Sequence, residues 1–193
     1  MDQRKKMKWI IFGIGAAILA AGVIAGMFSC GKHSPDYDTD SIDGGVVKRN
    51  DGADYPKTVA SKEITSFDGT FSLIAYADET RLERGVYTLV AILDGGMVKG
   101  SYKCSIRDGR SQSFEFESDL SFMDELYEIV AKYDFARYNG CTHTVSGLPH
   151  MYGACLDIQF VSGESIYSKD NQDNFLPIEA IEELEALFAG HCK

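Results

Sequence analysis

The pattern of apolar and polar positions divides the chain into three parts. Trp9–Phe28 is an uninterrupted apolar run, residues 31–62 show almost no periodic apolar pattern, and from Glu63 onward apolar and polar residues alternate. Alternation with a period of two is typical of a strand that has one buried and one solvated face. The pattern therefore predicts a hydrophobic leading segment (1–30), a flexible tether (31–62) and a folded domain (63–193).

Apolar residues recur at strand spacing in four successive stretches of the predicted domain: 64–76, 87–94, 98–107 and 113–117. Asp94-Gly95-Gly96 lies between the second and third stretches, and Asp108-Gly109 between the third and fourth. Both steps are typical of tight hairpin turns. The pattern predicts an antiparallel meander with one wet face. Shorter alternating stretches near His143, at 156–161 and at 164–168 predict further strands.

Two later stretches change to helical spacing. Phe122–Tyr133 carries apolar residues three and four apart, and Pro177 opens a similar pattern that continues to Ala189. An amphipathic helix buries its apolar stripe against another element, so both helices should cover the dry face of the sheet. We expect an α+β fold in which two helices pack on one face of an antiparallel sheet, preceded by the hydrophobic helix and the tether.

The leading segment has the features of a membrane helix. Trp9–Phe28 contains no charge and is about as long as a helix that crosses a bilayer, which needs roughly 20 apolar residues. Its cations all precede the run, and several aspartates follow it. This asymmetry favours a cytoplasmic amino terminus and a domain on the outer side of the membrane. We expect an extracytoplasmic location at the cell membrane.

The end of this segment resembles the signal of bacterial lipoproteins. Met27-Phe28-Ser29-Cys30 follows a basic start and an apolar middle, and the small Ser29 precedes the cysteine as in that class. The resemblance implies that Cys30 is lipidated and becomes the new first residue. Met27 and Phe28 depart from the usual residues at their positions. A retained transmembrane anchor and a cleaved, released domain are the alternatives.

Charge and composition exclude some partners. The chain has a formal net charge of −10, and without residues 1–30 it holds 15 Lys and Arg against 28 Asp and Glu. An anionic domain of this kind repels the phosphates of nucleic acids, so no nucleic-acid partner is expected. We expect contact with the membrane through the amino-terminal segment or through the lipid on Cys30.

The cysteines leave alternatives open. If Cys30 carries lipid, four cysteines remain outside the membrane, namely Cys104, Cys141, Cys155 and Cys192. An exported domain permits disulfides, and a domain of this size also folds without them. If a bridge forms, we expect it between Cys141 and Cys155, which flank one short connection.

Few residues in the sequence indicate catalysis or metal binding. His143 and His150 lie near Cys141 and Cys155, but their spacing is not that of a zinc site or of an activated thiol. No serine-hydrolase elbow, phosphate loop or EF-hand loop is present in the sequence. We therefore predict no catalytic residue, metal site or cofactor.

A cluster of tyrosines is the best candidate for a partner surface. Tyr138, Tyr152 and Tyr167 surround the irregular connection 138–155, and tyrosine is enriched at binding surfaces. Its large, stiff and half-polar ring suits contact with a partner. Tyrosines at the margin of a core would give the same pattern.

From about Glu63 to Ala189, the order of elements resembles uncharacterised exported domains of Gram-positive bacteria. The resemblance is carried by the Asp124–Tyr133 helix, the Leu156–Glu164 strand pair and the helix that Pro177 opens. It implies no activity. We expect a non-catalytic binding module of the cell envelope, with an unknown envelope protein or glycan as its partner. The alternative is an envelope hydrolase whose site one sequence cannot reveal.

Overall fold

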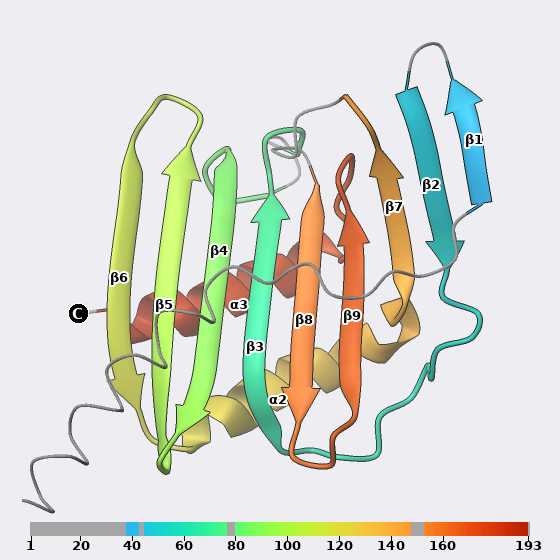
Figure 1. The fold of residues 1–193 in the computed structure, drawn as a ribbon. Helices are drawn as coiled ribbons and strands as arrows, with labels where there is room; N and C mark the ends of the chain where they lie inside the picture. Colours follow the sequence, from blue (N-terminus) through green and yellow to red (C-terminus); the bar gives the residue numbers. More distant parts are fainter. Residues whose placement is uncertain (1–37, 43–44, 77–79, 148–152, 193) are drawn as a thin grey trace, which may run out of the picture. The chain divides into compact units, whose positions relative to one another are not determined.

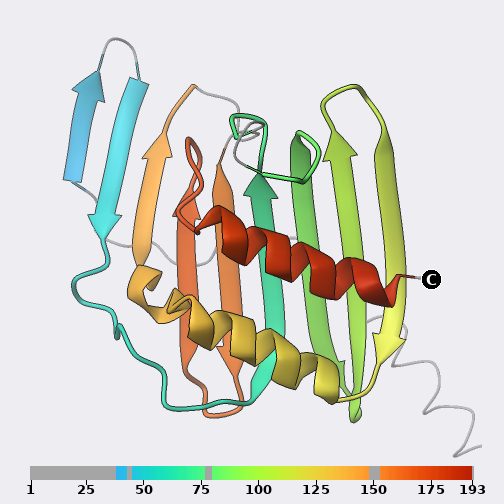
Figure 2. The ribbon, with the colours of Figure 1, turned by 180° about the vertical axis from the view of Figure 1, so that it is seen from behind.

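The computed structural model describes residues 38–42, 45–76, 80–147 and 153–192. Within them a nine-stranded sheet carries two α-helices on one face (Figures 1 and 2). Pro35–Lys193 form one compact unit. The fold class is α+β, as the sequence predicts. The hydrophobic segment 9–28 lies outside the described residues, and within them no helix is both long and apolar enough for a membrane span.

The strands run in the order β1-β2-β7-β9-β8-β3-β4-β5-β6 across the sheet. Their bounds, in chain order, are β1 Asp38–Ile42, β2 Gly45–Asp51, β3 Ile64–Ser72, β4 Gly85–Asp94, β5 Met97–Ile106, β6 Ser111–Ser118, β7 Cys141–Val145, β8 Ala154–Phe160 and β9 Ser165–Asp170. The helices are α2 Ser121–Lys132 and α3 Ile178–His191, and the short 3-10 helix η1 Phe135–Tyr138 follows α2.

The meander prediction holds for only half of the sheet. Strands β3 to β6 are consecutive antiparallel neighbours, as the alternation and the Gly-containing turns predict. The sheet as a whole is mixed, because β7 pairs in parallel with β9. This correction has a topological reason. The chain passes from β6 through α2 to β7, which leaves a space between β7 and β3 that β8 and β9 fill.

The flexible tether predicted for residues 31–62 is wrong for much of its length. Residues 38–42 and 45–51 form β1 and β2, and β2 pairs antiparallel with β7. The following stretch is also held to the domain, since the Glu164 carboxylate accepts the amides of Ala60 and Ser61, each at 3.0 Å. Backbone pairing requires no apolar periodicity, so these strands leave little trace in the hydrophobic pattern.

The core lies between the sheet and the two helices. Every second residue of the central strands faces the helices, and an aromatic cluster forms the middle of this layer. The centroid of the Phe188 ring of α3 lies 5.1 Å from that of Phe122 of α2. The same centroid lies 5.9 Å from those of Phe116 and Phe67. All four side chains are buried. Together these contacts fix both helices on one face, as the sequence predicts.

Candidate functional site

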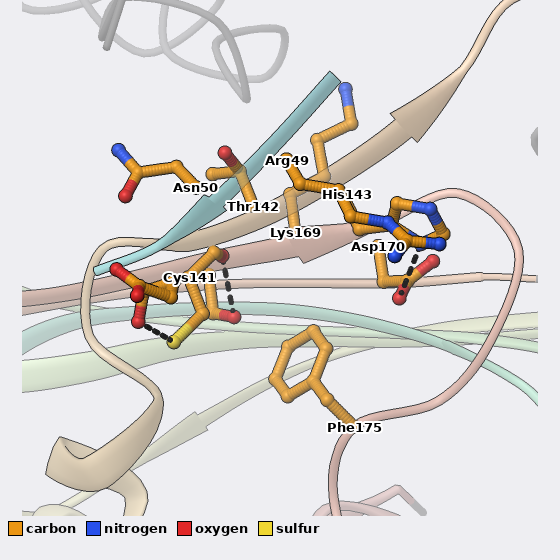
Figure 3. Close-up of a pocket in the computed structure, with 10 residues that line it drawn as sticks. Arg49, Asn50, Cys141, Thr142, His143, Lys169, Asp170 and Phe175 are labelled. Atoms are coloured by element: carbon orange, nitrogen blue, oxygen red, sulfur yellow. Dashed lines mark hydrogen bonds and ion pairs between the residues drawn. The ribbon is translucent and has the colours of Figure 1, made fainter. Parts of the chain in front are cut away.

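A shallow hollow of about 200 Å³ lies on the helix side of the sheet, over β2, β7 and β9. It forms there because neither α2 nor α3 extends over β2 (Figure 2). The hollow is lined by Arg49, Asn50, Asp51, Cys141, Thr142, His143, Ser168, Lys169, Asp170 and Phe175. Figure 3 shows Asn50, Thr142 and Lys169 extending away from Phe175, as strand alternation requires. We call the hollow on the Phe175 side the β2–β7–β9 groove.

Three polar side chains form a row across the floor of this groove. Arg49 is the register partner of His143, and His143 is the register partner of Asp170. Directly paired residues of neighbouring strands project from the same face of a sheet. Arg49, His143 and Asp170 therefore stand side by side on three adjacent strands, although almost a hundred residues separate the first from the second.

Asp170 orients the imidazole of His143. Its Oδ2 lies 3.1 Å from His143 Nδ1, while its Oδ1 accepts the amides of Gln172 at 2.8 Å and Asp173 at 3.1 Å. A carboxylate held in this way favours a proton on Nδ1. The other ring nitrogen, Nε2, is buried and has no hydrogen-bond partner within the described residues. In the neutral imidazole it is an unused acceptor.

The loop after β9 is clamped to β7 by Asn171. This buried side chain accepts the Val145 amide at 2.9 Å and donates to the Val145 carbonyl at 2.8 Å. The backbone N–H of Asn171 also donates to the His143 carbonyl at 3.2 Å. The side chain thus continues the β7–β9 ladder beyond the last parallel backbone pair and holds His143 beside Asp170.

Asn171→Ala should lower the free energy of unfolding by about 2 kcal/mol. The change removes two hydrogen bonds that the partly buried backbone groups of Val145 make with this side chain, and the loss of such partners costs about 1–3 kcal/mol. Chemical denaturation of the two proteins measures the difference. Asp54→Ala is the control, because Asp54 is exposed and lies outside the strands. A loss in Asn171→Ala no larger than in Asp54→Ala would contradict the role of the clamp.

Cys141 lies in the groove but is not paired with His143. It is a free thiol whose Sγ donates to the Asp51 carbonyl at 3.0 Å, and the Lys57 ammonium lies 3.6 Å from the same sulfur. The thiol therefore bonds toward β2, whereas the imidazole bonds toward β9. The structure does not bring Cys141 and His143 together as a nucleophile and its base.

The disulfide predicted between Cys141 and Cys155 is not formed. Cys141 is a free thiol, whereas Cys155 is not. The topology gives the reason, because β9 lies between the strands that carry the two cysteines. Two strand spacings amount to roughly 10 Å, and a disulfide requires Cα atoms within about 7 Å. Cys104 and Cys192 are also free thiols.

The predicted tyrosine surface does not assemble from the tyrosines that the structure describes. Tyr138 of η1 packs its ring on Phe175, with 5.4 Å between the centroids, and so supports the aromatic side of the groove. Tyr167 of β9 alternates with Ile166 and Ser168, which are buried under the helices, and therefore projects from the opposite face. Tyr152 and His150 lie outside the described residues.

A second cluster lies on the sheet face away from the helices. Asp68 of β3 is the register partner of Asp157 of β8, so their carboxylates stand side by side. Burial, and then the negative charge of Asp157, raise the pKa of Asp68. The sequence shows these residues only as polar positions in two distant strands, and only the β3–β8 pairing brings them together.

Asp68→Asn should stabilise the protein at neutral pH. Because the pKa of Asp68 is raised on folding, the folded state favours the protonated carboxyl and loses stability as the pH rises through that pKa. The advantage of the Asn variant should disappear near the unfolded value of 3.8, where the carboxyl is increasingly protonated in both states. Thermal unfolding at several pH values tests this, with the exposed Asp54→Asn as control. An advantage that does not change with pH would contradict it.

None of the protein-family models, curated proteins or solved structures compared with the chain matches it. In the part of the chain that the structure describes, no group of three or more His, Cys, Asp or Glu side chains is arranged to hold a metal ion. A function must therefore be inferred from the residues of this chain.

The sequence analysis did not single out Arg49, Asp170 or Phe175. Arg49 lies in the stretch predicted to be a tether, and Asp170 and Phe175 lie between the last predicted strand and the helix that Pro177 opens. His143 was singled out, but the carboxylate that orients it is 27 residues away in the sequence. No local signal connects these residues.

Proposed function

We propose that the protein is a non-catalytic binding module attached to the outer side of the cell membrane, where it holds another envelope component. The location is supported by the cations before Trp9, the uncharged run to Phe28 and the lipoprotein-like cysteine at position 30. The anionic composition of the remaining chain suits a soluble domain held near a membrane and repelled by its anionic surface.

The β2–β7–β9 groove is the proposed binding site. The observation that carries this proposal is the Arg49–His143–Asp170 row on a part of the sheet that the helices leave uncovered. Arg49 is exposed and has no ion-pair partner within the described residues, and Nε2 of His143 is unused. A planar guanidinium suits a carboxylate or a phosphate, and Phe175 provides an apolar side.

The ligand is therefore a small molecule, or the end of a larger one, that carries an anionic group beside an apolar part. Asp170 does not oppose an anion strongly, because its carboxylate is already engaged by His143 and by two backbone amides. Arg49 forms the charged contact, and its register partner His143 lies beside it on β7.

Ligand-observed NMR with small aromatic carboxylates and phosphates, each paired with its neutral amide or alcohol, tests the groove. Arg49→Gln should weaken binding of the anionic probes at least about tenfold, because a hydrogen bond to a charged group contributes about 1.5–3 kcal/mol. Arg84→Gln, which removes an exposed arginine outside the groove, is the matched control. Equal binding of the neutral probes, or an equal loss in both variants, would overturn the assignment.

A hydrolase is the second candidate, and one observation favours it. Asp170 orients His143 as a carboxylate orients the general base of a hydrolytic triad, and Nε2 is unused. The nucleophile is the missing part, since Cys141 bonds toward Asp51. Hydrolysis of a chromogenic ester that is lost in His143→Ala and kept in Arg84→Gln would favour the enzyme. No hydrolysis above the His143→Ala background would favour the binding module.

Mass spectrometry of the membrane fraction tests the mode of attachment. We expect an amino-terminal peptide that begins at Cys30 and carries acyl chains. An intact peptide that includes Met1 and Lys32 would show a retained anchor in place of a lipoprotein. An unmodified amino terminus in the soluble fraction would show release and would overturn membrane attachment.

A further inference from the structure

The free edge of β6 has the features of a peptide-binding edge. β6 is the last strand in the sheet order, so among the described residues one side of its backbone has no neighbouring strand (Figure 1). The strand is eight residues long and contains neither proline nor lysine. Proline, lysine, bulges and short length are the usual means by which proteins block a sheet edge. On β6 the only such feature is a pair of glutamates.

The hairpin geometry shows which residues face outward. The Ile106 amide donates to the Arg110 carbonyl at 2.8 Å, which makes these two a hydrogen-bonded pair. Bonded and non-bonded pairs alternate along an antiparallel ladder. The backbone groups of Gln112, Phe114 and Phe116 therefore face β5. By the same alternation, those of Ser113, Glu115 and Glu117 face away from the sheet.

The side chains of these outward residues carry the charge that selects a partner. Glu115 and Glu117 are exposed on the face away from the helices, and neither has an ion-pair partner within the described residues. The register partner of Glu117 is Lys99, but the Lys99 ammonium bonds to Asp94 at 2.5 Å. On the other face, Phe114 is 40% exposed beside the buried Phe116.

We propose that β6 accepts an extended peptide segment in which basic and apolar residues alternate. The segment adds a tenth strand through the outward backbone groups of Ser113, Glu115 and Glu117. Its basic side chains lie opposite the two glutamates, and its apolar side chains cover Phe114 on the other face. This is a second surface, at the opposite edge of the sheet from the β2–β7–β9 groove, and it does not depend on the groove's function.

Charge complementarity decides between this occupant and a second copy of the chain. Two β6 strands paired antiparallel about Glu115 would place Glu115 of one copy opposite Glu115 of the other, and like charges directly opposite each other are unfavourable. The same glutamates attract a basic strand. The pair thus opposes self-association through the edge while leaving it open to a basic partner.

The test uses the full chain in detergent micelles and the capped peptide Lys-Val-Lys-Val-Lys-Val-Lys. We expect the peptide to slow hydrogen exchange of the Ser113, Glu115 and Glu117 amides. The double variant Glu115→Lys with Glu117→Lys should bind the peptide at least about tenfold more weakly, since two attractive cross-strand pairs become repulsive. Glu125→Lys with Glu128→Lys, two exposed positions on α2, makes the same change in net charge and should bind like the unaltered chain.

Three results would overturn the proposal. The first is equal binding of a peptide of the same composition in the order Lys-Lys-Lys-Lys-Val-Val-Val, which would show charge attraction without strand pairing. The α2 double variant could lose as much affinity as the β6 variant. Sedimentation could show that the unaltered chain pairs with itself through β6, which would make a second copy the occupant.

Discussion

Phe188→Ala should lower the free energy of unfolding by about 4 kcal/mol, within the range of about 3–5 kcal/mol known for a buried phenylalanine. The Phe188 ring is completely buried and contacts rings from a second helix and from two strands. Neither helix can move to fill the space without losing its own contacts with the sheet. The cavity should therefore persist, and with it most of the cost.

Urea denaturation of the two proteins measures this effect. Leu187→Ala is the matched control, because Leu187 precedes Phe188 on α3 but is only partly buried. We expect the control to lose about 1 kcal/mol, in proportion to the apolar area that it buries. Similar losses in the two variants would show that the aromatic cluster is not the centre of the core.

Gly153→Ala should destabilise the protein by about 3 kcal/mol or more, although it adds a single methyl group. A Cβ atom at position 153 would overlap the carbonyl oxygen of Asp170 and crowd the backbone of Asn171. This backbone is already held on two sides, because Asp170 pairs with β8 and the Asn171 side chain bonds to Val145 of β7. The overlap can be relieved only by moving the end of β9.

The same change should also disturb the groove, because the end of β9 carries Asp170. We expect the His143 ring signals in an NMR spectrum to shift together with the loss of stability. Gly190→Ala is the control, since a Cβ there meets nothing within 4 Å. It should stabilise α3 slightly, by up to about 1 kcal/mol. A Gly153→Ala protein as stable as the original chain would contradict this packing.

Local sequence patterns predict one half of the fold and miss the other half, for a physical reason. The β3–β6 meander and both helices were predicted correctly because each has a local pattern. Alternation shows which side of a strand is buried, Gly-containing turns join neighbouring strands, and spacings of three and four residues mark a helical stripe. The central part of the fold follows from contacts between neighbouring segments.

The other half of the sheet was not predicted because its strands pair with distant partners. β2 was assigned to a tether, since only its backbone hydrogen bonds with β7 make it a strand. No turn motif in the sequence indicates the parallel pairing of β7 with β9, because the two strands are not joined by a hairpin. The predicted Cys141–Cys155 bridge was wrong for the same reason, because closeness in sequence does not reveal a strand inserted between two others.

The α+β class, the helix positions and the buried face of each meander strand follow from the amino-acid sequence alone, because they depend on the periodicity of neighbouring residues. The sequence also supplied the reasons to expect a membrane-attached domain. The row of Arg49, His143 and Asp170, and the free edge that β6 has among the described residues, become visible only in the folded domain. Both features depend on which strands become neighbours, and the pairing of distant strands is set by the packing of the whole domain.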